Sequence, residues 1–81
     1  MIRIDVELDG AWCTARELTG GARRSQLHAV HETALAHPGK RVRLRHANGS
    51  EQTFGEKGLR EMRRRNGFEV PEAPAEGKRV A

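Results

Sequence analysis

The first residues of the chain alternate strictly between apolar and charged side chains. The apolar members of this run are Ile2, Ile4, Val6 and Leu8. A period of two is typical of a strand with one buried face, so we predict a strand over residues 2–8 with these side chains inward. Asp9-Gly10 then supplies a two-residue turn. A second strand is predicted to return beside the first as far as residue 18.

A turn closed at Asp9-Gly10 determines which residues of this hairpin face each other. The predicted pairs are Leu8–Ala11, Val6–Cys13 and Ile4–Ala15. Cys13 is therefore predicted to point inward, as a buried and inert thiol. Trp12 is predicted on the opposite, less buried face beside Glu7, although a slip of one residue would turn it inward.

A helix is predicted over residues 22–36, after the break at Thr19-Gly20-Gly21. Its apolar stripe consists of Leu27, Val30 and Ala34. Three residues spaced in this way share one side of a helix with 3.6 residues per turn. The helix is predicted to end before Pro38, because the residue that precedes a proline avoids helical geometry.

A second alternating run follows over residues 40–46 and predicts a third strand. Val42 and Leu44 lie on one face of this strand. The opposite face carries Arg41, Arg43 and Arg45. The strand therefore separates an apolar side from a basic side.

Asn48-Gly49 predicts the turn of a second hairpin. A two-residue loop would place Phe54 on the arginine face. A three-residue loop, which adds the preceding alanine, pairs Val42 with Phe54 and Arg45 with Glu51. We favour the three-residue loop because it buries Phe54 and sets opposite charges side by side.

The last predicted element is a helix over residues 56–65, with Gly67 in position to cap its end. Its inward side chains are Leu59 and Met62. The predicted order is thus ββαββα: an α+β fold in which two hairpins pack with two helices. We predict one domain over residues 1–70 and a flexible, disordered polar tail over residues 71–81.

Length and composition limit the functions that this chain can have. Its 81 residues, of which 36% are hydrophobic and only three are aromatic, can build one thin core. A large enzyme with an enclosed pocket and a pair of independent domains are both excluded. No apolar run approaches the roughly 20 residues that cross a bilayer, so no membrane insertion is expected. The single cysteine allows no internal disulfide, and the expected compartment is a reducing bacterial cytoplasm.

The region from residue 25 to residue 70 resembles a known family. The matching features are Gly39-Lys40-Arg41-Val42, Asn48-Gly49, Thr53-Phe54, Leu59, Arg63-Arg64-Arg65 and Gly67-Phe68-Glu69-Val70. Together they resemble the head-to-tail joining protein W family of lambda-like tailed phages, whose fold is a helix, a hairpin and a helix. The chain departs from that family by its extra hairpin over residues 2–18 and its shorter last helix. The resemblance implies a small phage protein that connects or binds other proteins and is no enzyme.

Positive charge is concentrated in one segment. Residues 40–65 hold nine basic and three acidic side chains, whereas the segments on either side are each slightly acidic. We expect the strand arginines to merge with Arg60 and Arg64 of the last helix into one surface. Arginine binds carboxylates and phosphates equally well through its planar fork. A merely solvated face would show the same pattern.

No residue pattern in the chain predicts catalysis, a cofactor or a metal site. His28 and His31 lie one turn apart on the predicted helix, but a structural zinc site needs about four ligands. The glycines of Thr19-Gly20-Gly21 precede a helix without the Lys-Ser/Thr of a nucleotide-binding loop. No catalytic, metal-binding or cofactor-binding residue is therefore predicted.

These observations predict a small non-enzymatic protein of phage type that binds a protein with an acidic surface. The predicted contact residues are Trp12, Arg41, Arg43, Arg45, Arg60 and Arg64. Tryptophan is enriched among the residues that dominate protein interfaces. Such a protein would inhibit or modulate a host bacterial factor by occlusion, or act as a virion connector. The alternative is a nucleic-acid-binding protein that uses the same arginines, although no aromatic residues are interleaved with them to stack on bases.

Overall fold

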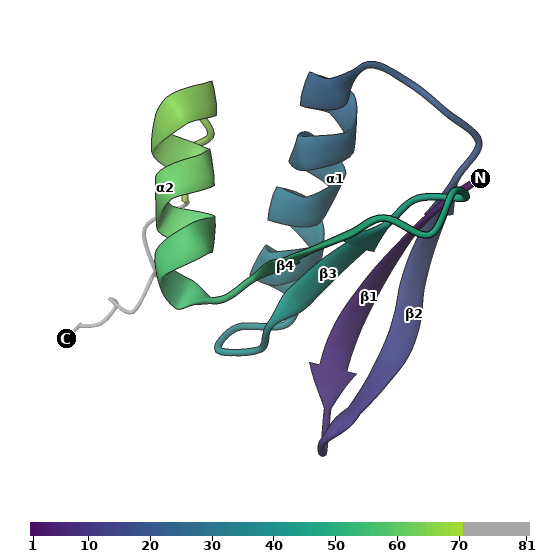
Figure 1. The fold of residues 1–81 in the computed structure, drawn as a ribbon. Coiled ribbons are helices and arrows are strands. Elements are labelled where there is room, and N and C mark those ends of the chain that lie inside the picture. The colour runs from purple at the N-terminus through teal and green to yellow at the C-terminus, as the bar shows by residue number, and fades with distance from the viewer. Residues whose placement is uncertain (71–81) are drawn as a thin grey trace, which may run out of the picture.

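Four strands form one antiparallel sheet in the order β2-β1-β3-β4, and two helices pack on one of its faces (Figure 1). The elements are β1 (Ile2–Leu8), β2 (Ala11–Leu18), α1 (Arg23–Ala36), β3 (Val42–Arg45), β4 (Glu51–Phe54) and α2 (Glu56–Asn66). This computed structural model describes residues 1–70. The predicted α+β class and ββαββα order are confirmed, while the predicted tail, residues 71–81, lies outside the described residues.

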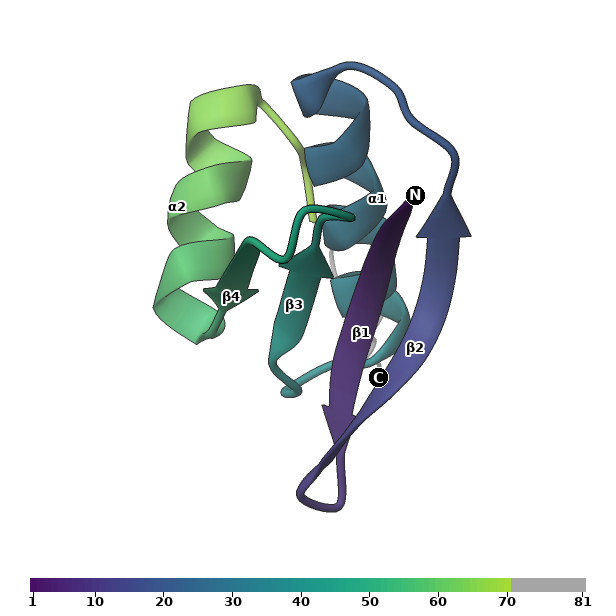
Figure 2. The ribbon, with the colours of Figure 1, turned by 45° about the vertical axis from the view of Figure 1, so that its right-hand side comes forward.

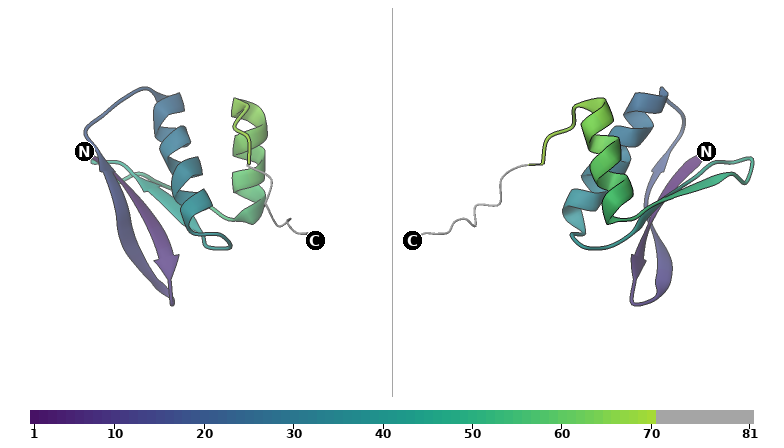
Figure 3. Two further views of the ribbon diagram at one scale, coloured as in Figure 1. Left: turned by 180° about the vertical axis from the view of Figure 1, so that it is seen from behind. Right: turned by 60° about the vertical axis from the view of Figure 1, so that its left-hand side comes forward.

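The two predicted hairpins are joined into a single sheet by pairing between β1 and β3. The paired residues are Arg3–Arg45, Ile4–Leu44, Asp5–Arg43 and Val6–Val42. Figures 2 and 3 show that β1 lies inside the sheet, between β2 and β3, while both helices stay on the same side. Alternate residues of β1 and β3 therefore face the helices, and the residues between them face the opposite side.

The apolar core fills the space between the sheet and the helices. Its members are Ile2, Ile4, Leu27, Ala29, Val30, Ala34, Val42, Leu44, Phe54, Leu59 and Met62. The predicted inward residues of both helices are all among them. The core is one layer deep, as expected for so short a chain.

The first hairpin turns at Asp9 and Gly10, which both have positive φ, 53° and 81°. This conformation matches the right-handed twist of the two strands. The predicted pairs Leu8–Ala11 and Val6–Cys13 are confirmed, and Glu7 faces Trp12. The predicted pair Ile4–Ala15 is wrong, because the register shifts between Ile4 and Asp5 and Ile4 pairs with Arg16. Ala15 is the extra residue of this bulge.

Cys13 is exposed, so its predicted burial is also wrong. Its register places it on the helix side of the sheet. However, the tip of the β1–β2 hairpin projects past the end of α1 (Figure 2). The helix packs over β1 and β3 and leaves the outer part of β2 uncovered, which the alternation of residues along one hairpin does not reveal.

The second hairpin has the predicted three-residue loop. Val42 pairs with Phe54 and Arg45 with Glu51, so Phe54 is buried. Gly49 closes the loop with a φ of 93°, a conformation that costs glycine little. The strands are shorter than predicted, and β3 covers only Val42–Arg45.

The end of α2 is fastened back onto α1. Gly67 adopts the left-handed conformation of a helix cap, and the backbone N–H of Phe68 donates to the carbonyl of Arg63 at 3.0 Å. The Phe68 ring then stacks on His31 with centroids 5.2 Å apart. This contact holds the end of α2 against α1.

His31 is buried in this contact and accepts a hydrogen bond at Nδ1 from Arg63 Nε, at 2.9 Å. Burial lowers the pKa of His31 below its ordinary value of 6.5, and the neighbouring charges of Arg63 and His28 lower it further. The folded protein therefore holds this imidazole neutral.

Within residues 1–70, no helix is long and apolar enough to span a membrane.

We expect the folded state to lose stability as the pH falls below about 6.5, because the unfolded chain takes up the His31 proton first. The loss ends once the pH is below the lowered pKa of the folded protein. Urea unfolding at about pH 7.5 and about pH 5.5 measures it. His31→Gln should lose distinctly less stability between these two conditions, whereas His46→Gln should behave like the wild type. An equal loss in both variants would show that His31 is not responsible.

Candidate functional site

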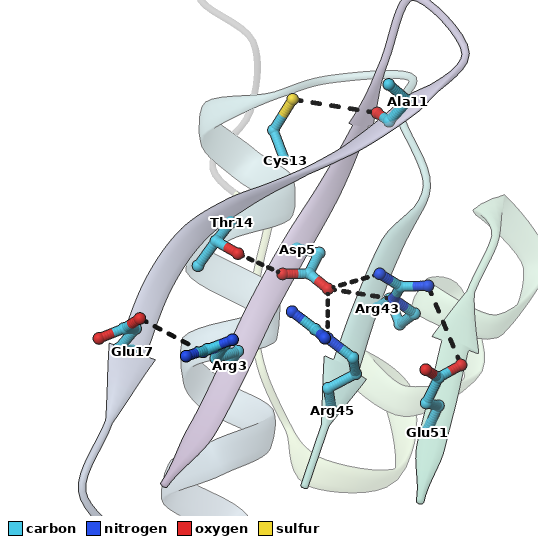
Figure 4. A network of polar contacts seen from close by, with 9 residues as sticks. All are labelled: Arg3, Asp5, Ala11, Cys13, Thr14, Glu17, Arg43, Arg45 and Glu51. Atoms are coloured by element: carbon cyan, nitrogen blue, oxygen red, sulfur yellow. Dashed lines mark hydrogen bonds and ion pairs between the residues drawn. The ribbon is translucent and has the colours of Figure 1, made fainter. Parts of the chain in front are cut away.

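The face of the sheet that the helices leave uncovered carries a continuous set of polar side chains around one tryptophan. We call it the open sheet face. Its residues are Arg3, Asp5, Glu7, Trp12, Thr14, Glu17, Arg41, Arg43, Arg45 and Glu51. They come from all four strands, and Figure 4 shows the central part of the network.

Asp5 lies at the centre of the open sheet face and is only 1% exposed. Its Oδ2 accepts hydrogen bonds from Arg43 Nε and Nη2, at 3.1 and 2.8 Å, and from Arg45 Nε at 2.8 Å. Its Oδ1 accepts one from the Thr14 hydroxyl at 2.9 Å (Figure 4). Every oxygen of this buried carboxylate is therefore satisfied, as burial of a charge requires.

The pKa of Asp5 depends on two opposing effects, its burial and the hydrogen bonds from these partners. Burial alone would raise it, but the hydrogen bonds from Arg43, Thr14 and Arg45 outweigh that effect and hold the pKa below its ordinary value of 3.8. Asp5 is thus ionised at neutral pH, and its charge is shared by two guanidinium groups.

Trp12 is half-buried against the same arginines. The guanidinium of Arg43 lies 4.4 Å from the centroid of the indole ring, and that of Arg41 lies 5.6 Å away. Arg41 is held by Glu7, to which its Nε and Nη2 donate at 2.8 Å each. Both arginines are therefore fixed by carboxylates, and the indole ring is positioned by cation–π contacts with groups that cannot move freely.

Charge on the open sheet face is balanced. Four arginines are matched by four carboxylates: Arg3, Arg41, Arg43 and Arg45 against Asp5, Glu7, Glu17 and Glu51. Glu51 lies near Arg43, at 3.9 Å, while Arg45 turns to Asp5 instead of its predicted partner Glu51. The predicted basic surface is therefore absent here, because β1 brings its own acidic residues beside the arginines.

Arg60 and Arg64 lie elsewhere, on the outer side of α2. Their side chains are 72% and 75% exposed. The helix α2 lies on the side of the sheet that the helices cover (Figure 3), whereas the strand arginines belong to the open sheet face. The prediction that all five arginines merge into one surface is wrong. Strand residues of one parity point away from the core, whereas α2 packs on the core side, so the two sets end on opposite sides of the molecule.

Six residues of the open sheet face were not among the sequence-based candidates: Arg3, Asp5, Glu7, Thr14, Glu17 and Glu51. A signal for Asp5 was present, because acidic residues alternate along the first strand with the same period as arginines along the third. Such complementary patterns are typical of neighbouring strands. A signal for Thr14 was present too, because the register set by the Asp9-Gly10 turn continues from Val6–Cys13 to Asp5–Thr14.

No protein-family model matches this chain. No curated protein and no solved structure matches it either. The resemblance to the joining protein W family therefore stays a prediction, and the geometry of the open sheet face carries the functional argument.

Among residues 1–70, the cysteine and the histidines do not come together as a reactive site. The thiol of Cys13 lies 4.0 Å from the carbonyl of Ala11. His28 contacts Glu32 at 3.8 Å on the surface of α1. Over residues 1–70, no three His, Cys, Asp or Glu side chains are grouped as a metal ion would require.

Asp5→Asn should lower the free energy of unfolding by about 3 kcal/mol, because it leaves two partly buried guanidinium groups without their counter-charge. Chemical denaturation at neutral pH measures the change. Glu17→Gln is the matched control: this carboxylate is half-exposed beside Arg3, and its loss should cost less than about 1 kcal/mol. Similar costs for the two variants would show that Asp5 has no special structural role.

Proposed function

We propose that this chain is a non-enzymatic protein-binding module that docks on its partner through the open sheet face. The single observation that supports this most directly is the position of Trp12, in contact with Arg41 and Arg43 on the face of the sheet that neither α1 nor α2 covers (Figure 1). In a phage-type accessory protein such docking would block a host bacterial protein or connect two virion proteins.

Several physical features favour a protein as the partner. Tryptophan and arginine are the residues that most often carry interface energy. The side chains around Trp12 are already immobilised by ion pairs, so binding would cost little additional conformational entropy. A face with balanced charges also has no general attraction for a polyphosphate, which favours an interface of specific contacts.

The arginines suggest which groups such a partner would present. Arg41 uses Nε and one terminal nitrogen for Glu7, and Arg45 uses Nε for Asp5. Within residues 1–70, no further partner is recorded for their remaining nitrogens, and both side chains reach solvent. The partner would thus offer an apolar hollow for the indole, flanked by carboxylate or carbonyl oxygens.

Affinity capture from bacterial lysate, with and without nuclease, tests the proposal. The tagged wild type should retain one protein in near-equal amount after nuclease treatment. Trp12→Ala should weaken its binding by roughly 30-fold, corresponding to about 2 kcal/mol, and more than any single arginine substitution. The binding can then be titrated with the purified partner.

Arg60→Ala is the matched control, because it removes a large exposed side chain far from the open sheet face and should leave this affinity unchanged. Circular dichroism must show that Trp12→Ala is folded. Full affinity in a folded Trp12→Ala variant would contradict the proposal. So would loss of every captured protein on nuclease treatment, which would make the binding one of nucleic acid.

A further inference from the structure

The positive charge of the chain is concentrated on α2. The whole chain has a net charge of +4. This single helix contributes a surplus of three positive charges, with Lys57, Arg60, Arg63, Arg64 and Arg65 against Glu56 and Glu61. Because the open sheet face is neutral, the field of the molecule comes mainly from the helix layer on its other side.

Three of these cations form a stripe on the solvent side of α2. At 3.6 residues per turn, Lys57, Arg60 and Arg64 fall within about 60° of one another, opposite the buried Leu59 and Met62. At 1.5 Å per residue the stripe is about 10 Å long. Two intrahelical carboxylates offset it only in part: Glu56 lies 3.9 Å from Arg60, and Glu61 accepts a hydrogen bond from Arg64 at 3.2 Å. Both pairs are exposed to solvent and are therefore weak.

The basic surface continues onto the beginning of α1. Arg23, Lys57 and Arg65 line a hollow of ≈ 580 Å³ between α1, β4 and α2. Gln52 stands in the same hollow and accepts a hydrogen bond from Arg23 at 2.7 Å. Three cations from two helices thus line one depression, together with a single carboxylate, Glu61, and neutral hydrogen-bonding groups.

The composition of this surface indicates phosphates as its ligand class. The arginines of a protein interface usually surround an aromatic anchor that fills a pocket on the partner. The outer side of α2 offers no such anchor, because its apolar residues Leu59 and Met62 are buried. Among residues 1–70 the exposed large hydrophobic side chains are Met1 and Val70, neither of which belongs to α2. Phosphate binding needs no such anchor, since release of counterions from the nucleic acid supplies its free energy.

We propose that the outer surface of α2, with Lys57, Arg60 and Arg64 at its centre, binds the phosphate backbone of double-stranded nucleic acid. A duplex is favoured over a single strand because this surface has no exposed aromatic ring on which bases would stack. The binding is independent of base sequence, as contacts to phosphates alone carry no sequence information. Protein docking and duplex binding then use opposite sides of the molecule.

Fluorescence anisotropy with a random-sequence DNA duplex tests this proposal. Three phosphate contacts predict a slope of about −3 for log K against log[salt]. In Arg60→Gln/Arg64→Gln the slope should become shallower by about 2, with roughly tenfold weaker binding at low salt. Both positions are highly exposed, so the fold should survive, and circular dichroism verifies that it does.

Arg3→Gln/Arg16→Gln is the matched control, because it removes the same charge from exposed ion pairs away from α2. It should bind duplex nearly as well as the wild type, and Trp12→Ala should do so too.

An equal loss in the two double variants would overturn the proposal, because total charge alone would then explain binding. Absence of duplex binding at about 50 mM salt would also overturn it. Equally tight binding of polyglutamate would replace it with an acidic protein as ligand. None of these three results affects the proposal for Trp12.

Discussion

Burial of the Asp5 carboxylate organises the sheet. A charge that is 1% exposed would be strongly destabilising without compensation. Its partners come from both neighbouring strands: Thr14 on β2, and Arg43 and Arg45 on β3. The Asp5 carboxylate therefore joins three strands. It favours the one register in which all of its hydrogen bonds form. A shift of β3 by one residue would turn both arginines toward the apolar core.

The polar side chains of the open sheet face form a second layer, on the opposite side of the sheet from the apolar core. On the helix side, one layer of aliphatic residues packs against two helices, which is all that a chain of this length can bury. On the other side of the sheet, Arg43 and Arg45 bind Asp5, which is 1% exposed, and the guanidinium of Arg43 lies over the Trp12 ring. The sheet is thus protected on a face that no helix covers. The same side chains give that face a fixed shape, which is the property a docking surface needs.

The separation of charge follows from the topology. Acidic residues of β1 neutralise the arginines of β3, whereas the arginines of α2 have only weak surface partners. A cluster that is continuous in sequence, residues 40–65, is therefore divided between a neutral face and a basic one. The two functions that we propose therefore use different sides of the molecule. Protein binding is proposed for the face around Trp12 and phosphate binding for α2.

The sequence by itself determined the local elements of this protein. Period-two runs, the Asp9-Gly10 and Asn48-Gly49 turns and the helical apolar stripe specify the six elements and the loop that buries Phe54, because each depends on residues that are close in the chain. The pairing of β1 with β3, the bulge at Ala15 and the reach of α1 over the sheet depend on contacts between distant residues. Only the tertiary structure decided these, and with them the exposure of Cys13, the burial of Asp5 and the separation of Arg60 and Arg64 from the strand arginines. Local sequence patterns indicate which side of a helix or strand is apolar. Packing and charge compensation across the whole fold determine which helices and strands contact each other.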